Sequence, residues 1–177
     1  TTDNSSAVFT LHSGNWLSNA KSNTTFEIGN GGSTAISRSY KALRINNRII
    51  NDIDKAPLTP EQKNEILGQA YFYRSWFYFQ IIKRYGGMPI IDKVFEGGDD
   101  DIPRVTYHES HDWMMEDIQK AIYMLPDSWD DPNYGRPTKI AAMALKEWAQ
   151  LFDASPLMQN DLNSTENKGY DTERAKS

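Results

Sequence analysis

Residues 68–92 read GQAYFYRSWFYFQIIKRYGGMPIID, and this stretch decides the fold. Between Tyr71 and Tyr85, aromatic and aliphatic residues cover nearly the whole circumference of a helix, whereas a surface helix carries one apolar stripe. A helix that is apolar all round is buried on most of its sides. The sequence therefore predicts a central buried helix in an all-α domain.

Local signals predict where this helix begins and ends. Thr59 can cap the free amides, Pro60 suits the first helical position, and the side chain of Gln62 can close a capping box. Gly86 and Gly87 can supply the left-handed residue that ends a helix, and a proline follows shortly after them. The central helix is therefore expected to run from Pro60 to Tyr85.

The same kinds of signal predict three more helices. One precedes the central helix, over about 34–54, and has apolar residues at helical spacing. A second capping box, from Thr106 to Glu109, opens a helix that reaches about residue 125. The last is expected over about 138–155, where apolar residues again recur at helical spacing.

The four helices form two pairs. The first pair is expected within 34–87 and the second within 105–158, after a loop-rich lead-in over 1–33. Residues 171–177 have the pattern of a helix start, so we expect a further helix there. Antiparallel pairs that stack on their neighbours predict an all-α fold of tetratricopeptide-like helix pairs, an α-α superhelix, with long loops.

Composition excludes several classes of function. The formal net charge of −5 argues against a nucleic-acid partner held through its phosphates. The absence of cysteine excludes disulfides, thiolate metal sites and a cysteine nucleophile. We expect no cofactor, and no catalytic residue is identified: Glu116 and Asp117 are adjacent on a helix and therefore point in different directions, unlike a glycosidase pair.

The central helix and its flanks resemble the signature of the SusD/RagB family. That signature is an aromatic-rich helix that contains an arginine and ends in Tyr-Gly-Gly-x-Pro. Flanking segments resembling those of the family occur in the same order, and the resemblance covers about residues 37–160. The residues that match the signature are Arg74, Trp76, Tyr85, Gly86, Gly87, Pro89 and Arg136.

The resemblance implies a cell-surface lipoprotein of the outer membrane of Bacteroidetes. Such proteins sit as lids on TonB-dependent, SusC-like transporters and capture glycans such as starch-like polysaccharides, or in some cases peptides, without catalysis. The chain would be the N-terminal part of a longer protein, and its only membrane attachment would be a lipid anchor that this cysteine-free chain does not carry. A helical-repeat interaction scaffold without a glycan site is the alternative.

Two groups of residues are candidates for ligand contact. Sugars bind to flat aromatic rings flanked by groups that form hydrogen bonds, since their C–H faces are apolar and their edges are hydroxyls. Trp16, Asn19 and Asn23 provide such groups in the lead-in, and Trp129 and Tyr134 provide aromatic rings in the loop before the last helix. In both groups the alternative is that the aromatic residues dock on the core.

Arg74 and Arg84 lie on the central helix. They could contact a ligand or partner, but a charge on a buried helix must be paired. We therefore expect both guanidinium groups to stack on aromatic rings or to pair with carboxylates of the next helix.

Three other motifs are weak candidates for binding sites. His108 and His111 with Asp112 could bind zinc, but further ligands are missing from the pattern. The acidic run 99–101 lacks the alternating pattern of a calcium loop, and the glycine-rich segment 29–34 lacks the lysine of a phosphate-binding loop. No metal site is predicted.

Overall fold

The computed structural model describes residues 35–95, 102–155 and 158. The chain divides into two units, 1–38 and 39–177, and the described residues of the first unit are Ala35–Arg38. The helices are α2 (Ala35–Asp52), α3 (Pro60–Tyr85), α4 (Tyr107–Met124) and α5 (Lys139–Asp153), with short 3-10 helices η1 (Ile53–Lys55) and η2 (Asp131–Asn133).

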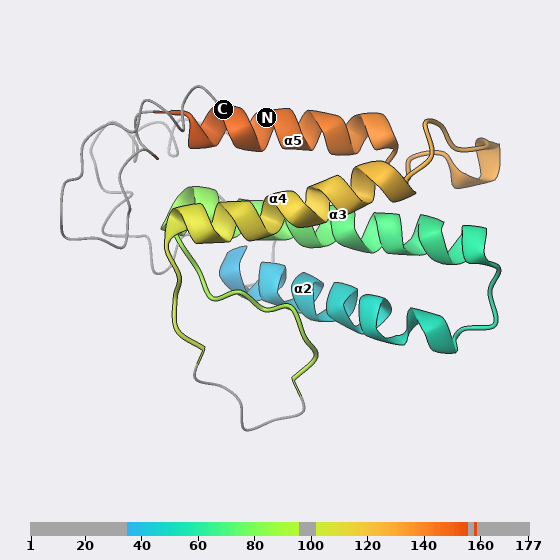
Figure 1. Ribbon diagram of the computed structural model, residues 1–177, viewed down its shortest axis with the longest axis horizontal. Helices are drawn as coiled ribbons and strands as arrows, with labels where there is room; N and C mark the ends of the chain where they lie inside the picture. The colour runs from blue at the N-terminus through green and yellow to red at the C-terminus, as the bar shows by residue number, and fades with distance from the viewer. Residues whose placement is uncertain (1–34, 96–101, 156–157, 159–177) are drawn as a thin grey trace, which may run out of the picture. The chain divides into compact units, whose positions relative to one another are not determined.

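The predicted all-α fold is confirmed, because every regular element in the described part of the chain is a helix. Consecutive helices run antiparallel (Figure 1), and α4 packs against both α3 and α5. The helix expected over 34–54 ends as α2 at Asp52 and continues as η1. The lead-in 1–33 and the further helix start at 171–177 lie outside the described residues.

Capping explains where α3 and α4 begin. The Thr59 hydroxyl accepts a hydrogen bond from the backbone N–H of Gln62, and the Gln62 side chain accepts one from the backbone N–H of Thr59. Thr106 and Glu109 form the same reciprocal pair at the start of α4. Both predicted capping boxes are therefore confirmed.

Glycine ends α3 as predicted. Gly86 has a φ of 75°, a conformation that side chains with a Cβ rarely adopt, and its backbone N–H donates to the carbonyl of Ile82. The chain then leaves the helix axis toward Pro89, which has no N–H with which to continue the helix.

The core forms around α3, which packs against both α4 and α5. Gly68 makes a close approach to the end of α4 possible, since a Cβ at this position would lie 3.0 Å from the Cβ of Met124 and 3.1 Å from Cγ of Leu125. Fully buried side chains of α3 then fill the interior, as expected for a helix that is apolar all round. They include Tyr78, Phe79, Ile81 and Ile82.

Among the described helices, none has the length and apolarity needed to cross a bilayer.

Candidate functional site

The loop between α4 and α5 is anchored through Trp129. Its indole N–H donates to the carbonyl of Pro137 over 2.7 Å, and its ring packs against the buried cluster of Ala121, Leu125 and Ala142. The guanidinium of Arg136 lies 5.5 Å from the centre of the ring. Trp129 thus docks on the core, which was the alternative to ligand contact in the sequence analysis. Its contact with a ligand stays a prediction.

The same loop presents Tyr134 to solvent. Its side chain is 90% exposed, and it follows η2 at the tip of the loop. The next residue, Gly135, has a φ of 92°, which a side chain with a Cβ would strain. Ligand contact by Tyr134 also stays a prediction. The ring is accessible to a ligand, because its side chain faces solvent and not the core.

The predicted residues Trp16, Asn19 and Asn23 lie outside the described residues. Their contact with a ligand stays a prediction. The acidic run 99–101 and the glycine-rich segment 29–34 also lie outside them.

Arg74 is part of a buried polar network. Its Nε and Nη2 donate to the two carboxylate oxygens of Asp117 on α4, and its Nη1 donates to Oδ1 of Asn47 on α2 over 2.8 Å. The guanidinium also lies near the rings of Tyr71 and Trp113, at 5.4 and 5.0 Å from their centres. The pairing predicted for Arg74 is confirmed, and it connects three helices.

Asn47 extends this network to the segment after α3. Its Nδ2 donates to the carbonyls of Ile91 and Lys93 over 2.9 and 3.0 Å. One amide side chain thus contacts α3 and also holds a segment that has no regular structure of its own.

For Arg84 the predicted pairing is wrong, because this exposed side chain donates to the carbonyl and side chain of Gln80 on its own helix.

Several hydrogen bonds hold the Tyr-Gly-Gly-x-Pro segment, residues 85–89. Arg104 donates to the carbonyls of Gly87 and Tyr85 over 2.8 and 2.7 Å. The Tyr78 hydroxyl donates to the carbonyl of Met88 over 2.9 Å, and burial raises the pKa of this tyrosine. The side chains of Arg104 and Tyr78 therefore hold the chain between α3 and α4 in place.

Aromatic side chains also join α3 to α5. The Trp148 ring contacts Trp76 and Phe79, with ring centres 5.8 and 5.1 Å apart. Lys83 places its Nζ 4.5 Å from the centre of the Trp148 ring. Burial, with the nearby charge of Arg84, lowers the pKa of Lys83 to about 8.

The outer face of α5 is apolar and exposed. Four large apolar side chains are exposed there, with exposed fractions of 42–74%, although the Trp148 ring also contacts α3. They are Ile140, Met143, Trp148 and Leu151. Exposed apolar side chains that gather on one helix are typical of a site of association.

The histidines of α4 pair with carboxylates. Nδ1 of His108 lies 3.3 Å from Oδ1 of Asp153 on α5, and Nδ1 of His111 lies 3.4 Å from Oδ1 of Asp112. Within the described ranges, no group of three or more histidine or acidic side chains is arranged to hold a metal ion.

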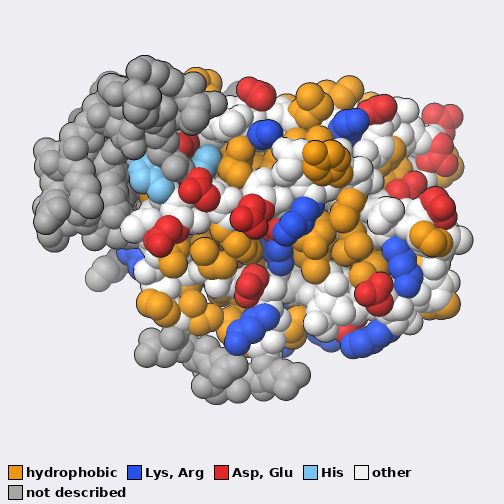
Figure 2. Space-filling model, viewed as in Figure 1, with side chains coloured by type: hydrophobic (Ala, Val, Ile, Leu, Met, Phe, Trp, Pro, Cys, Tyr) orange, Lys and Arg blue, Asp and Glu red, His pale blue; other side chains and the backbone are white. Residues whose placement is uncertain are grey.

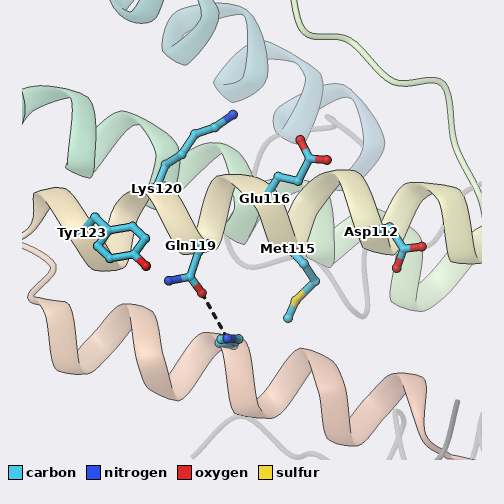
Figure 3. A pocket seen from close by; sticks show the side chains of 7 residues that line it. Asp112, Met115, Glu116, Gln119, Lys120 and Tyr123 are labelled. Atoms are coloured by element: carbon cyan, nitrogen blue, oxygen red, sulfur yellow. Dashed lines mark hydrogen bonds between the residues drawn. The ribbon is translucent and has the colours of Figure 1, made fainter. Parts of the chain in front are cut away.

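Sequence reasoning missed a hollow of about 690 Å³ on the surface of α4 and α5. Six of its lining side chains come from α4, from Asp112 to Tyr123, and Lys146 comes from α5 (Figure 3). Figure 2 shows the face formed by α4 and α5, where apolar side chains lie between acidic and basic ones. One signal for the hollow was present in the sequence, because the aromatic residue Tyr123 lies outside the apolar stripe of its helix. In the structure the Tyr123 side chain is 81% exposed.

Comparisons with known proteins connect the fold to one family. A family model described as "Starch-binding associating with outer membrane", SusD-like_3, matches residues 1–147. The SusD-like protein P38 of Formosa agariphila is 28% identical over 102 residues, which are 56% of this chain and 20% of that protein.

Solved structures agree with this match. A SusD-like protein from Bacteroides fragilis superposes with a TM-score of 0.66 and 36% identity, over 68% of this chain and 24% of that one. A laminarin-binding SusD-like protein superposes with a TM-score of 0.64 over 70% of this chain and 27% of its own, and its 20% identity shows the fold alone. The chain thus spans a quarter or less of the length of the first two of these relatives.

Proposed function

Because this chain belongs to the SusD-like family, we propose that it is part of a cell-surface protein that binds a glycan and delivers it to a SusC-like, TonB-dependent transporter of the outer membrane. The family model, which matches residues 1–147, carries this proposal. We also propose that the full-length protein is attached to the membrane by a lipid anchor, as the family resemblance implies.

The described part of the chain supports capture by an aromatic ring. Tyr134 is 90% exposed on a loop that Trp129 anchors to the core. A solvent-facing ring suits the apolar face of a sugar, which can stack on it. Trp16, Asn19 and Asn23 of the lead-in are proposed to add hydrogen bonds and a second ring.

Binding without catalysis fits the carboxylates of α4. Asp117 is buried and bonded to Arg74, whereas its neighbour Glu116 faces solvent. A glycosidase pair needs two carboxylates that flank one bond, roughly 5–10 Å apart. These two side chains point to different environments, so the pair does not provide that arrangement.

Affinity gel electrophoresis of the full-length protein tests the proposal. A panel of starch, laminarin and other plant, host and microbial polysaccharides should contain at least one glycan that retards the protein. Tyr134→Ala should weaken this retardation, whereas Tyr134→Phe, which keeps the ring, should preserve most of it. Retardation unchanged in Tyr134→Ala would place the glycan site elsewhere.

A protein that no glycan retards would contradict glycan binding. The peptide-capturing lid would then be tested by binding of a peptide library, and the interaction scaffold by co-purification of partners.

Delivery to the transporter has its own test. An affinity tag on the full-length protein should recover a SusC-like barrel from solubilised outer membranes, and recovery of the tagged protein alone would contradict that step.

A further inference from the structure

We propose that the hollow on α4 and α5 is a second contact point for the glycan, a subsite that holds one neutral sugar unit of an extended chain. This inference rests on the proposed function. It concerns side chains other than Trp129 and Tyr134, and it rests on the placement of Tyr123, Gln119 and Lys146.

The first observation is an exposed aromatic ring beside the hollow. Tyr123 is 81% exposed, although most large apolar side chains of α4 face the core. It lines the hollow together with Met115, two turns earlier on the same helix. An aromatic ring and an apolar side chain give the C–H face of a sugar a surface on which to pack.

The second observation is a fixed row of polar groups beside that ring. Gln119 lies one helical turn before Tyr123, and residues at this spacing are neighbours on the helix surface. In Figure 3 the hydroxyl end of Tyr123 points toward the Gln119 amide, which extends toward α5. The Lys146 ammonium on α5 donates to Oε1 of Gln119 over 3.1 Å, so that the amide has a fixed orientation.

This bond between helices determines which groups a ligand would meet. Because Oε1 of Gln119 accepts from Lys146, its NH₂ group is directed to the other side and can donate. Lys146 retains further N–H donors, and the Tyr123 hydroxyl can donate or accept. Sugar hydroxyls both donate and accept, and therefore match this set.

Charge favours a neutral ligand over an anionic one. The carboxylates of Asp112 and Glu116 line the hollow with Lys120 and Lys146, and the Lys120 ammonium also contacts Asp117 at 3.5 Å, so the lining has no excess of positive charge. A site for a phosphate or sulfate would instead need an excess of positive charge. The lining therefore suits an uncharged polyol.

Titration followed by NMR tests the subsite on the isotope-labelled full chain. The probes are maltoheptaose and laminarihexaose. Binding at the hollow should shift the side-chain amide signals of Gln119 and the ring signals of Tyr123 at the same ligand concentrations. Shifts confined to other residues would overturn the subsite and leave glycan binding intact. No shift anywhere with either probe would overturn the subsite for these two glucans, whereas glycan binding itself is decided by the polysaccharide panel.

Variants add a measurement of affinity. Tyr123→Ala should weaken binding of the responding oligosaccharide by about fivefold to tenfold, as expected for the loss of one stacking contact. Tyr123→Phe is the matched control and should retain most of the affinity, since it keeps the ring. Thermal unfolding should show that both variants are folded, because this side chain is exposed. Equal affinity of Tyr123→Ala and the unaltered chain would overturn the proposal.

Discussion

Arg74 on α3 and Asp117 on α4 form a two-point contact in the protein interior, with Nη2 and Oδ1 2.8 Å apart and side chains that are 5% and 1% exposed. The residues are 43 positions apart in the sequence. Because Asn47 binds the same guanidinium, this contact determines how α2, α3 and α4 meet.

Asp117→Asn should destabilise the protein by about 3–5 kcal/mol, because it leaves the Arg74 charge buried without its partner. The free energy of unfolding in urea measures this cost. Lys55→Ala is the control: its pair with Asp52 lies at the surface, and its loss should cause no measurable change. An unaltered unfolding curve for Asp117→Asn would contradict the structural role of the pair.

Removing both charges should cost less than removing one. In Arg74→Met with Asp117→Leu, no unpaired charge stays buried, so the double variant should recover part of the stability lost in Asp117→Asn. The same urea experiment measures the recovery. If the loss of stability in the double variant equalled the sum of the losses in Arg74→Met and Asp117→Leu alone, the two side chains would act independently.

Gly68→Ala should destabilise the protein even though alanine favours helices. The new Cβ would lie 3.0 Å from Met124 and 3.1 Å from Leu125, closer than ordinary van der Waals contact. We expect a net loss of about 1–3 kcal/mol in thermal or urea unfolding, as for other overpacked cores. Adding Leu125→Ala should make the substitution at Gly68 less costly, because it removes one of the two side chains that the Cβ would meet.

Lys83 should make stability depend on pH. Burial lowers its pKa in the folded protein to about 8, below the ordinary value of 10.5. Between these values the unfolded state binds more protons, so this group's contribution to stability should rise as pH increases from 8 toward 10.5. Melting temperatures of the unaltered chain and of Lys83→Met, measured from pH 7 to 9.5, should show this rise in the former alone. Parallel curves would contradict the lowered pKa.

Trp129 and Tyr134 should respond differently to substitution. Trp129→Phe removes the donor that binds the Pro137 carbonyl and should cost about 1 kcal/mol or more of stability. Tyr134→Ala should leave the melting temperature unchanged, because this side chain is 90% exposed. A large loss of stability in Tyr134→Ala would mean that its ring packs against the protein in solution.

The outer face of α5 should promote association of the chain. Its exposed apolar side chains include Ile140 and Leu151, at 66% and 74% exposure. Sedimentation velocity should show association that grows with concentration, and replacing both residues by lysine should reduce it. Glu147→Gln is the control for a change of charge on the same helix. Association of equal strength in the lysine variant would place the contact elsewhere.

Most of the helical framework could be predicted from sequence. Both capping boxes formed as expected, and α3 has the predicted ends Pro60 and Tyr85. The reason is physical: a cap satisfies backbone groups within one turn, so three or four neighbouring residues decide it. The pairing of Arg74 could also be anticipated, although its partner could not be identified as Asp117.

The candidate site could be predicted only in part. The sequence identified Trp129 and Tyr134 as aromatic loop residues, but it did not separate the docked ring from the exposed one. It also gave no indication that Gln119 and Lys146 would meet. Packing between distant segments decides both outcomes, and one chain alone carries no signal for such contacts.

By itself, the sequence determined the all-helical class, the starts of α3 and α4 and the burial of α3, because capping and helical periodicity act over a few residues. Only the tertiary structure decided which carboxylate binds Arg74, which tyrosines face solvent and where α4 and α5 form a hollow in the surface. These features depend on contacts between residues such as Gln119 and Lys146, 27 positions apart, which become neighbours once the helices pack.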